Sequence, residues 1–455
     1  MIKAGTRRAI AASIAVVAAA AVPAPALAAE AHVETIDGVK VIVFNAAPGE
    51  LQSVLVDRDP GFTNDQYQLE DQNNKVSAGT GCANPPRTPF AGVEEKIVRC
   101  DASATTIRVN LADGRDSVRF GDLSGHLITD VVDGGDGDDS LDTSNGSGLI
   151  MGGPGDDTID ANAGDDEVIG GDDDDTIVGG PGSDTISGDA GDDKIRGHAT
   201  PDTHEIGKVT DFRAGDVNKL AGGPGNDTIV GDNGTDELTG DTGNDNLNGA
   251  GAADLLDGGA GNDTIDEGDT PGDPNGGGPA GPLAPDTVRG GSGTDTATYC
   301  TRHYSDSEAR KHTLTITLDD KANDGEKGEK DQIGSKGDVE NVLGGGVTND
   351  RITGNSRANE LIGDCLSTFT SSGDNKLYGA GGNDKLVGSS GRDLLNGGKG
   401  ADRFLGNEDA DTIQAKDGAR DKSINCDGLG AKSSKDSATV DRSDPTPFNC
   451  DKLRR

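Results

Sequence analysis

The chain contains no tryptophan, and aromatic residues make up only 3% of its 455 residues. So little large apolar material argues against a compact core of ordinary size, although the length alone would allow two to four domains. A solenoid needs fewer large apolar side chains, because each repeat packs only against its neighbours around a thin aliphatic stripe. The composition therefore favours a solenoid.

Positive charge is also scarce in this chain. The sequence has 41 Lys and Arg against 81 Asp and Glu, which gives a formal net charge of -40. The phosphate backbone of nucleic acid and the surface of an anionic membrane would both repel such a chain. A disordered acidic chain is the alternative, but branched aliphatic residues recur here at a fixed spacing, which disorder does not produce.

Familiar catalytic motifs are missing as well. The one His-Glu pair, His204-Glu205, is not followed by the second histidine of the H-E-x-x-H metalloprotease motif. There is no G-x-S-x-G nucleophile elbow, and the glycine-rich runs lack the lysine of a phosphate-binding loop. Carboxylates occur in pairs, as in glycosidases, but the repeats account for them. We therefore expect a non-catalytic protein.

Cysteine is limited to six residues, and none belongs to a C-x-x-C pair, which argues against a cysteine-bound metal. In an exported chain these residues would form disulfides. Six cysteines allow fifteen pairings. Proximity in the sequence favours Cys82–Cys100 and Cys426–Cys450, which would leave Cys300–Cys365.

Glycine, in contrast, is abundant, with 72 residues. Residues 152–196 repeat one nine-residue unit five times without a gap, as GGPGDDTID, ANAGDDEVI, GGDDDDTIV, GGPGSDTIS and GDAGDDKIR. Glycine is frequent at the first four positions, the sixth position is always Asp, and the eighth is always Ile or Val. Repeats with a fixed period are the signature of a solenoid.

Each unit combines a turn with a strand. The first six residues form the turn, because Gly adopts positive φ without steric cost and Asp tolerates turn geometry. The next three form a short strand whose middle side chain faces inward. Two units close one coil, so each position-6 Asp stacks over the Asp eighteen residues later. Stacked carboxylates repel one another, and Ca²⁺, which prefers oxygen ligands, would join them.

The units resemble the RTX family of haemolysin-type calcium-binding repeats, whose consensus is G-G-x-G-x-D-x-U-x. Three units fit the consensus at every fixed position: GGPGDDTID at 152–160, GGPGNDTIV at 222–230 and GGAGNDTID at 258–266. The resemblance implies an all-β fold, a parallel β-roll that is a right-handed β-solenoid. It also implies that position-6 carboxylates and turn carbonyls bind Ca²⁺ between successive coils.

Nine pairs of position-6 residues are eighteen residues apart and have Asp at both places. These pairs define the candidate calcium ligands. They are Asp139, Asp157, Asp166, Asp175, Asp184, Asp193, Asp227, Asp236, Asp245, Asp254, Asp263, Asp384, Asp393, Asp402 and Asp411.

The N-terminus has the features of a bacterial secretory signal peptide over residues 1–28. A basic start and an apolar run precede the cleavage sequence Ala26-Leu27-Ala28. A membrane helix is the alternative, but the run is short for a span. Residues 29–120 then contain four strand-like runs, at 39–44, 51–56, 97–100 and 106–109. We expect a small β segment that caps the roll, and a carbohydrate- or surface-binding module is the alternative.

The repeats divide the rest of the chain into blocks. We expect β-roll at 121–298 with loops at 197–212 and 267–289, a β insertion at 299–344 with a strand at 313–318, more β-roll at 345–414, and a polar, disulfide-framed tail at 415–455. Position 6 is occupied in a weak first unit by Asp116, and elsewhere by Asn218 and Asn359.

The sequence therefore predicts a secreted or extracellular calcium-binding protein that folds on calcium. Its role would be structural or adhesive at the cell surface or matrix, with surface or matrix polysaccharide or protein as possible partners. We expect no nucleic-acid partner and no stable membrane insertion. The alternative is an extracellular enzyme of the epimerase, lyase or hydrolase type that acts on polysaccharide and uses the roll as a scaffold.

Overall fold

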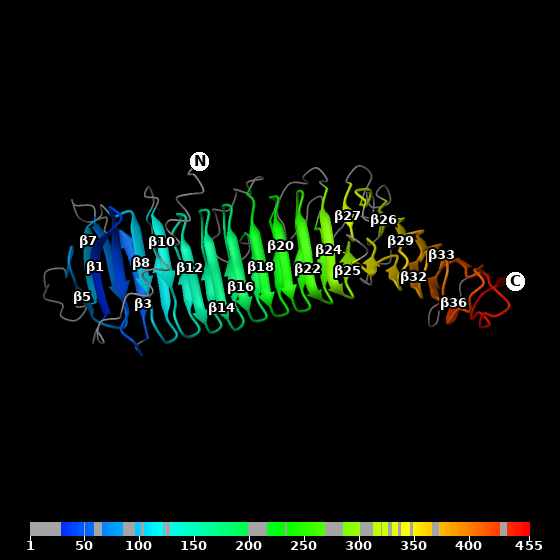
Figure 1. Ribbon diagram of the computed structural model, residues 1–455, viewed down its shortest axis with the longest axis horizontal. Coiled ribbons are helices and arrows are strands. Elements are labelled where there is room, and N and C mark those ends of the chain that lie inside the picture. The colour runs from blue at the N-terminus through cyan, green and yellow to red at the C-terminus, as the bar shows by residue number, and fades with distance from the viewer. Residues whose placement is uncertain are drawn as a thin grey trace.

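The computed structural model describes residues 29–49, 51–58, 66–84, 96–101, 104–121, 123, 128–198, 216–232, 234–268, 285–300, 313–319, 321–325, 330–334, 338–345, 349–365, 373–427 and 435–455. The predicted signal peptide, and most of the two predicted loops at 197–212 and 267–289, lie outside this part of the chain. Within it the protein is all β, with 38 strands and no helix. The strands stack along one long axis between the two ends of the molecule (Figure 1).

The strands form three sheets, and almost every strand of the repeats is hydrogen-bonded to strands one coil away. The first sheet contains, in order, β5 (Val76–Ala78), β1 (Ala29–Ile36), β2 (Val39–Asn45), β8 (Thr106–Asn110), β10 (Thr129–Asp133), β12 (Leu149–Pro154), β14 (Glu167–Asp172), β16 (Thr185–Ala190), β18 (Lys219–Pro224), β20 (Glu237–Thr242), β22 (Leu255–Gly261), β24 (Thr287–Gly293) and β27 (Gln332–Ile333).

The second sheet runs the whole length of the molecule. It contains β6 (Cys82–Ala83), β7 (Ile97–Asp101), β4 (Gln66–Asp71), β3 (Ser53–Arg58), β9 (Ser117–Phe120), β11 (Ser140–Asp142), β13 (Thr158–Asp160), β15 (Thr176–Val178), β17 (Lys194–Arg196), β19 (Thr228–Val230), β21 (Asn246–Asn248), β23 (Thr264–Asp266), β25 (Thr296–Thr298), β28 (Asn341–Leu343), β30 (Glu360–Ile362), β32 (Lys385–Ser390), β34 (Arg403–Glu408) and β36 (Ser423–Asp427).

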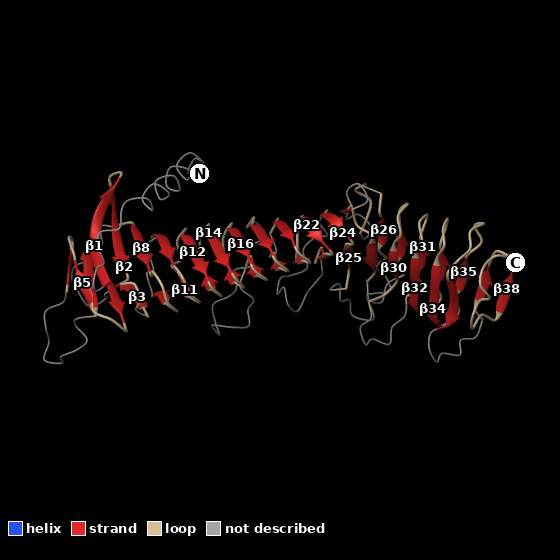
Figure 2. Ribbon diagram, turned by 60° about the horizontal axis from the view of Figure 1, so that its bottom comes forward, coloured by secondary structure: helices blue, strands red, loops and turns tan. Residues whose placement is uncertain are grey.

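The third sheet faces the second one in the C-terminal part. It contains β26 (Thr315–Thr317), β29 (Arg351–Thr353), β31 (Lys376–Tyr378), β33 (Leu394–Asn396), β35 (Thr412–Gln414), β37 (Ser437–Thr439) and β38 (Lys452–Arg454). Figure 2 shows that the described elements are strands from one end of the molecule to the other.

The repeats build the roll through a parallel register of eighteen residues. In the first sheet Val168 lies between Ile150 and Ile186, and in the second sheet Ile159 lies beside Ile177. These position-8 side chains are at most 1% exposed, because the middle residue of each three-residue strand points into the roll. The predicted coil and the all-β parallel β-roll are confirmed.

The N-terminal residues form a small β unit of mixed strand direction. β1 and β2 form an antiparallel hairpin, and β4 is antiparallel to both β3 and β7. β2 and β3 then pair in parallel with β8 and β9, which begin the roll. Buried side chains of this unit, such as Phe44 and Tyr67, belong to the same core as the roll. The unit therefore covers the N-terminal end of the aliphatic stripe.

Residues 299–344, predicted as an insertion, add strands to the sheets of the roll. β27 extends the first sheet beyond β24, and β28 lies between β25 and β30 in the second. β26 lies within the predicted strand at 313–318 and starts the third sheet by pairing with β29. The predicted loop at 267–289 is wrong at its C-terminal end, because residues 287–289 already belong to β24.

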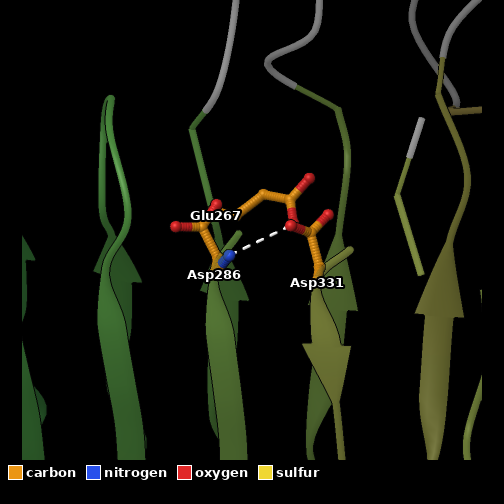
Figure 3. A group of neighbouring side chains, drawn as sticks. All are labelled: Glu267, Asp286 and Asp331. Carbon is orange, nitrogen blue, oxygen red and sulfur yellow. Dashed lines mark hydrogen bonds between the residues drawn. The ribbon is translucent and has the colours of Figure 1, made fainter. Parts of the chain in front are cut away.

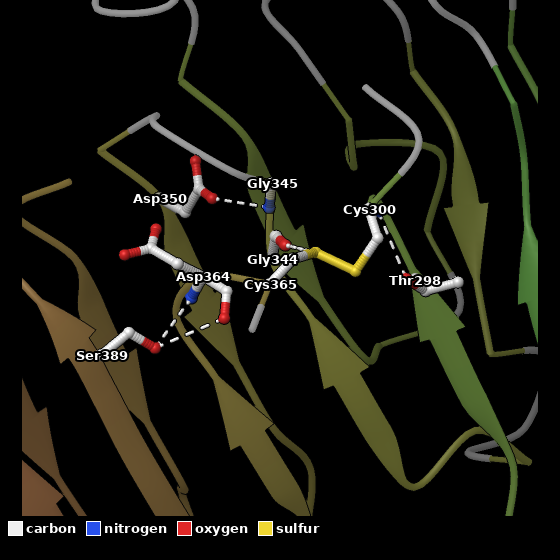
Figure 4. The surroundings of a disulfide bond; sticks show 8 residues. All are labelled: Thr298, Cys300, Gly344, Gly345, Asp350, Asp364, Cys365 and Ser389. Atoms are coloured by element: carbon white, nitrogen blue, oxygen red, sulfur yellow. Dashed lines mark hydrogen bonds between the residues drawn. A yellow bond between two sulfur atoms is a disulfide. The ribbon is translucent and has the colours of Figure 1, made fainter. Parts of the chain in front are cut away.

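The two disulfides that sequence proximity favoured, Cys82–Cys100 and Cys426–Cys450, are formed, and so is the remaining pair Cys300–Cys365. The Cys300–Cys365 bridge joins the residues that follow β25 to those that follow β30, and so spans the coil that contains β28 (Figure 4). The Cys300 N–H donates to Thr298 Oγ1 at 3.2 Å on one side of this bridge. On the other side, the Asp364 N–H donates to Ser389 Oγ at 3.2 Å.

Candidate metal sites

Every predicted calcium ligand lies in a turn, directly before a strand of the roll, and is buried. The position-6 carboxylates are at most 3% exposed. Because successive units contribute to opposite sheets, these carboxylates form two rows, one along each edge of the roll. Asp157 and Asp175 precede β13 and β15 of the second sheet, whereas Asp166 precedes β14 of the first.

One oxygen of each carboxylate links neighbouring coils. The Asp157 N–H donates to Asp175 Oδ1 at 2.8 Å, and the Asp175 N–H donates to Asp193 Oδ1 at 2.8 Å. On the other edge, the Asp166 N–H donates to Asp184 Oδ1 at 2.9 Å. The Oδ1 row therefore satisfies backbone donors that burial would otherwise leave unpaired.

The second oxygen of the carboxylate is different. Oδ2 is buried and has no hydrogen-bond partner at Asp139, Asp157, Asp166, Asp175, Asp184, Asp193, Asp227, Asp245, Asp263, Asp384, Asp393 and Asp411. Nearly all buried polar atoms in proteins have a partner. A repeated row of unpartnered anionic oxygens therefore indicates that each of them binds something else.

A backbone carbonyl lies close to most of these oxygens. A Cβ atom on Gly170, at position 1, would lie 2.2 Å from Asp175 Oδ2 and 2.7 Å from the Gly188 carbonyl oxygen of the next coil. A side chain at Gly170 would displace these two oxygens, although the unit of Asp166 has Ala161 at this position. The glycine therefore keeps a carboxylate oxygen and a carbonyl oxygen near the same point.

Burial, and repulsion between neighbouring carboxylates, oppose ionisation of the position-6 side chains. Burial, reinforced by the charges of Asp157 and Asp193, raises the pKa of Asp175 to about 8. Burial, with the nearby charges of Asp411 and Asp364, raises the pKa of Asp393 to about 9. To be ionised at neutral pH such carboxyl groups need a compensating positive charge, and none of the described Lys or Arg residues forms an ion pair with Asp175 or Asp393.

Comparison with protein families identifies these repeats. A sequence model of the RTX calcium-binding nonapeptide repeat, written for four copies, matches residues 129–150, 142–177, 169–203, 214–247, 230–265, 369–395 and 378–413. The chain carries RTX calcium-binding nonapeptide repeats. A search of curated proteins finds no significant relative. Among the described residues, no helix is long and apolar enough to cross a membrane.

The donor set of these RTX repeats suits Ca²⁺. Ca²⁺ takes six to eight oxygen ligands, both carboxylates and carbonyls, whereas zinc and copper sites use nitrogen or sulfur. The repeats offer oxygen alone, and the Oδ2 row supplies the negative charge. The residues that would hold the ion are therefore the position-6 carboxylates, with the carbonyl oxygens of the turns.

The structure joins all nine predicted pairs of RTX carboxylates. In each pair, the N–H of the first Asp donates to Oδ1 of the second across one coil, at 2.7 to 2.9 Å. Asp236 is an exception in another respect, because its Oδ2 accepts the Asp232 N–H at 2.8 Å. Its carboxylate is therefore less available to an ion than the others.

Asp116 and Asp295 belong to the row but were not predicted, because their partners are not eighteen residues away. The Asp263 N–H donates to Asp295 Oδ1 across an interruption of the repeats, and the Asp116 N–H donates to Asp139 Oδ1 at the start of the row. The predicted ligands Asp193 and Asp227 are likewise joined across an interruption, a pair that the spacing did not predict. Counting position 6 within each unit, instead of the spacing along the chain, would have found Asp116 and Asp295.

Three carboxylates meet where the first block of RTX repeats is interrupted. Oxygen atoms of Glu267, Asp286 and Asp331 lie within 4.8 Å of one another, and all three side chains are buried (Figure 3). The Asp286 N–H donates to Asp331 Oδ1 at 3.0 Å, which continues the row of the first-sheet edge. The sequence places these residues in a loop and an insertion, so only the fold shows their proximity.

Proposed function

We propose that this protein is a secreted, non-catalytic calcium-binding protein whose roll folds when Ca²⁺ binds between its coils. The observation that carries this proposal is the row of buried Oδ2 atoms without hydrogen-bond partners along both edges of the roll. A calcium-free roll must either bury these charges unpaired or protonate the carboxylates, and both are costly at neutral pH, whereas each bound ion offsets the repulsion between two coils.

The size of the calcium effect follows from mass action. Extracellular calcium modules bind with a Kd of about 10⁻⁴ to 10⁻³ M. At about 1 mM free Ca²⁺, a site with a Kd of about 10⁻⁴ M stabilises the folded state by about 1.4 kcal/mol. Several such sites together reach the stability of a whole domain, which is about 5 to 15 kcal/mol.

The test is a calcium titration of the chain from Ala29 onward, followed by far-UV circular dichroism and started in EGTA. We expect a cooperative transition from coil to β structure at about 0.1 to 1 mM Ca²⁺, with no such transition in Mg²⁺, which demands a tighter octahedral site. A β spectrum that is already complete in EGTA would contradict folding on calcium.

We further propose that the protein acts outside the cell, in a structural or adhesive role at the cell surface or matrix. The RTX repeats, the three disulfides and the calcium concentration that the sites require all support an exterior location. Cleavage of the leader on export, read by N-terminal sequencing of the secreted protein, tests the location. Turnover of an acidic polysaccharide by the pure protein would contradict the non-catalytic role.

A further inference from the structure

An open groove lies on the outer face of the second sheet near the C-terminal end. It has a volume of about 460 Å³, and its polar rim includes Arg403, Ser423, Asn425 and Asn449. The ring of Phe448 lines one side and is 66% exposed, the highest value among the exposed large hydrophobic side chains of the described residues. The groove does not include any position-6 carboxylate.

Leu405, at the outward end of β34, contributes an aliphatic side chain to this groove. Outward positions at the end of each strand pair in register from coil to coil. In the first part of the roll they are of mixed character and include Asp142, Asp160, Val178, Arg196 and Val230. From β28 to β34 aliphatic side chains occupy this position without interruption, as Leu343, Ile362, Val387 and Leu405.

The charge of the molecule changes at the same place. Residues 129–298 contain 39 Asp and Glu against six Lys and Arg, a net charge of -33, whereas residues 345–455 contain 17 against 16, a net charge of -1. At the groove, Lys385 pairs with Glu360. Arg403 forms no ion pair with any described residue, so its guanidinium group is available for an anionic ligand.

The edge of the sheet beside the groove is already occupied. The Phe448 N–H donates to the Ile424 carbonyl at 3.0 Å, and the Cys426 N–H donates to the Phe448 carbonyl at 3.1 Å. A peptide could therefore not extend the sheet as an added strand at β36, which is the usual way in which a sheet edge binds a peptide. A ligand must lie on the face of the sheet instead.

We propose that this groove binds an acidic saccharide, with a sugar ring against Phe448 and its carboxylate on Arg403. The apolar face of a pyranose ring matches the exposed aromatic ring of Phe448 and the side chain of Leu405. The hydroxyl groups of the sugar match the side-chain amides of Asn425 and Asn449 and the hydroxyl of Ser423. The two amides are neighbours, since Asn449 Nδ2 donates to Asn425 Oδ1 at 3.4 Å. This inference rests on the proposed function, because calcium would fold the roll that carries the groove.

The test is isothermal titration of the full chain in saturating calcium with trigalacturonic acid, which is too short to be gelled by calcium. The neutral trisaccharide maltotriose and a tri-glutamate peptide serve as comparison ligands. We expect binding of the acidic sugar only. Arg403→Gln and Phe448→Ala should each weaken it roughly tenfold, the usual value of a charge-assisted hydrogen bond or an aromatic contact.

Arg392→Gln is the matched control, because Arg392 lies in the same part of the roll but outside the groove, paired with Asp374 at 2.9 Å. It should leave the affinity unchanged. Equal binding of the tri-glutamate peptide, or no binding to a chain that does fold on calcium, would overturn the inference and leave the proposed function intact. A chain that is folded in EGTA and still binds the sugar would support the groove and contradict the folding switch.

Discussion

At the scale of a single residue, the two oxygens of each position-6 side chain have separate roles. Oδ1 accepts a backbone N–H from the preceding coil, and Oδ2 faces a turn carbonyl without a hydrogen-bond partner. The protein itself contains the substitution that separates these roles. Asn218 accepts the Asp184 N–H at 2.9 Å through its amide oxygen, so it keeps the link between coils without carrying a charge.

The substitution Asp175→Asn should therefore act in opposite directions with and without calcium. In EGTA it removes a buried charge and should raise the free energy of unfolding by about 1 to 2 kcal/mol. At about 1 mM Ca²⁺ it removes a ligand shared by two junctions and should lower that free energy by about 3 kcal/mol. The β content by circular dichroism in EGTA, where the parent chain is coil, measures the first change, and urea denaturation in calcium measures the second.

Asp174→Asn is the control for this experiment. Asp174 occupies position 5 of the same unit, is exposed, and accepts the Asp192 N–H at 2.8 Å. Its substitution should leave the calcium midpoint almost unchanged. If both variants shift the midpoint equally, general charge and not ligation by Asp175 is responsible.

At the scale of the repeat unit, the glycine at position 1 is required by the site and the residue at position 3 is not. In the unit at 379–387, a Cβ on Gly379 would lie 2.3 Å from Asp384 Oδ2 and 2.4 Å from the Gly397 carbonyl. Gly379→Ala should cost about 3 kcal/mol or more, because backbone atoms of two coils must move. Thermal melts in calcium measure the loss.

Gly381→Ala in the same turn is the matched comparison. The nearest atom to a Cβ there is the Lys399 carbonyl oxygen at 3.8 Å, which is ordinary contact. This variant should melt within a few degrees of the parent chain, roughly the effect of under 1 kcal/mol. A large loss at Gly381 would mean that the turn needs glycine for a reason other than the carboxylate.

The stabilisation that each disulfide gives grows slowly, as the logarithm of the length of chain that it encloses. Cys300 and Cys365 are 65 residues apart, against 18 for Cys82 and Cys100. Replacing both Cys300 and Cys365 by Ser should lower the free energy of unfolding by about 4 kcal/mol, and the same change at Cys82 and Cys100 by about 3 kcal/mol. Equal or reversed losses in urea melts would contradict a loop-closure effect.

The sequence predicted the repeating elements well because their cause is local. Turn residues and one inward aliphatic residue repeat every nine positions, so β13 and β15 follow from Ile159 and Ile177 alone. The hydrogen bonds between position-6 residues on either side of an interruption could not be predicted from a spacing of eighteen residues. The Asp263 N–H, for example, donates to Asp295, which is 32 residues later in the sequence. The N-terminal strands β1 and β4 were not predicted either: β4 depends on an antiparallel partner, β7, that is distant in sequence, and β1 lies outside the periodic repeats although its partner β2 follows it directly.

At the scale of the whole molecule, the rows of carboxylates make stability depend on pH. Without calcium, burial raises the pKa of Asp157 to about 7 and that of Asp175 to about 8, above the value near 4 of an unfolded chain. Raised folded-state pKa values stabilise the fold fully below about pH 4, and this contribution is lost as the pH rises through about 7 to 8.

In EGTA the β content of the calcium-free chain should therefore rise as the pH falls from about 8 towards 4. In calcium the dependence is reversed, because protons compete with the ion for the same oxygens, so the calcium midpoint should move to higher concentration in acid. Circular dichroism across this pH range, in EGTA and in calcium titrations, measures both trends. Stability in EGTA that grows with rising pH would contradict the calcium-free repulsion.

The hydrogen bonds of the position-6 carboxylates also have a direction. The earlier coil donates its N–H and the later coil brings the accepting carboxylate, as from Asp157 to Asp175 and from Asp175 to Asp193, whereas the bonds of position 5 run the other way, as from the Asp192 N–H to Asp174. A chain that emerges amino end first thus presents, on each coil, a position-6 N–H that the next coil satisfies. The N-terminal β unit supplies the first such donor, because the Gln52 N–H donates to Asp116 Oδ1 at 2.7 Å. Assembly can advance behind the point of emergence one coil at a time, each arriving coil pairing the open donor of the coil before it.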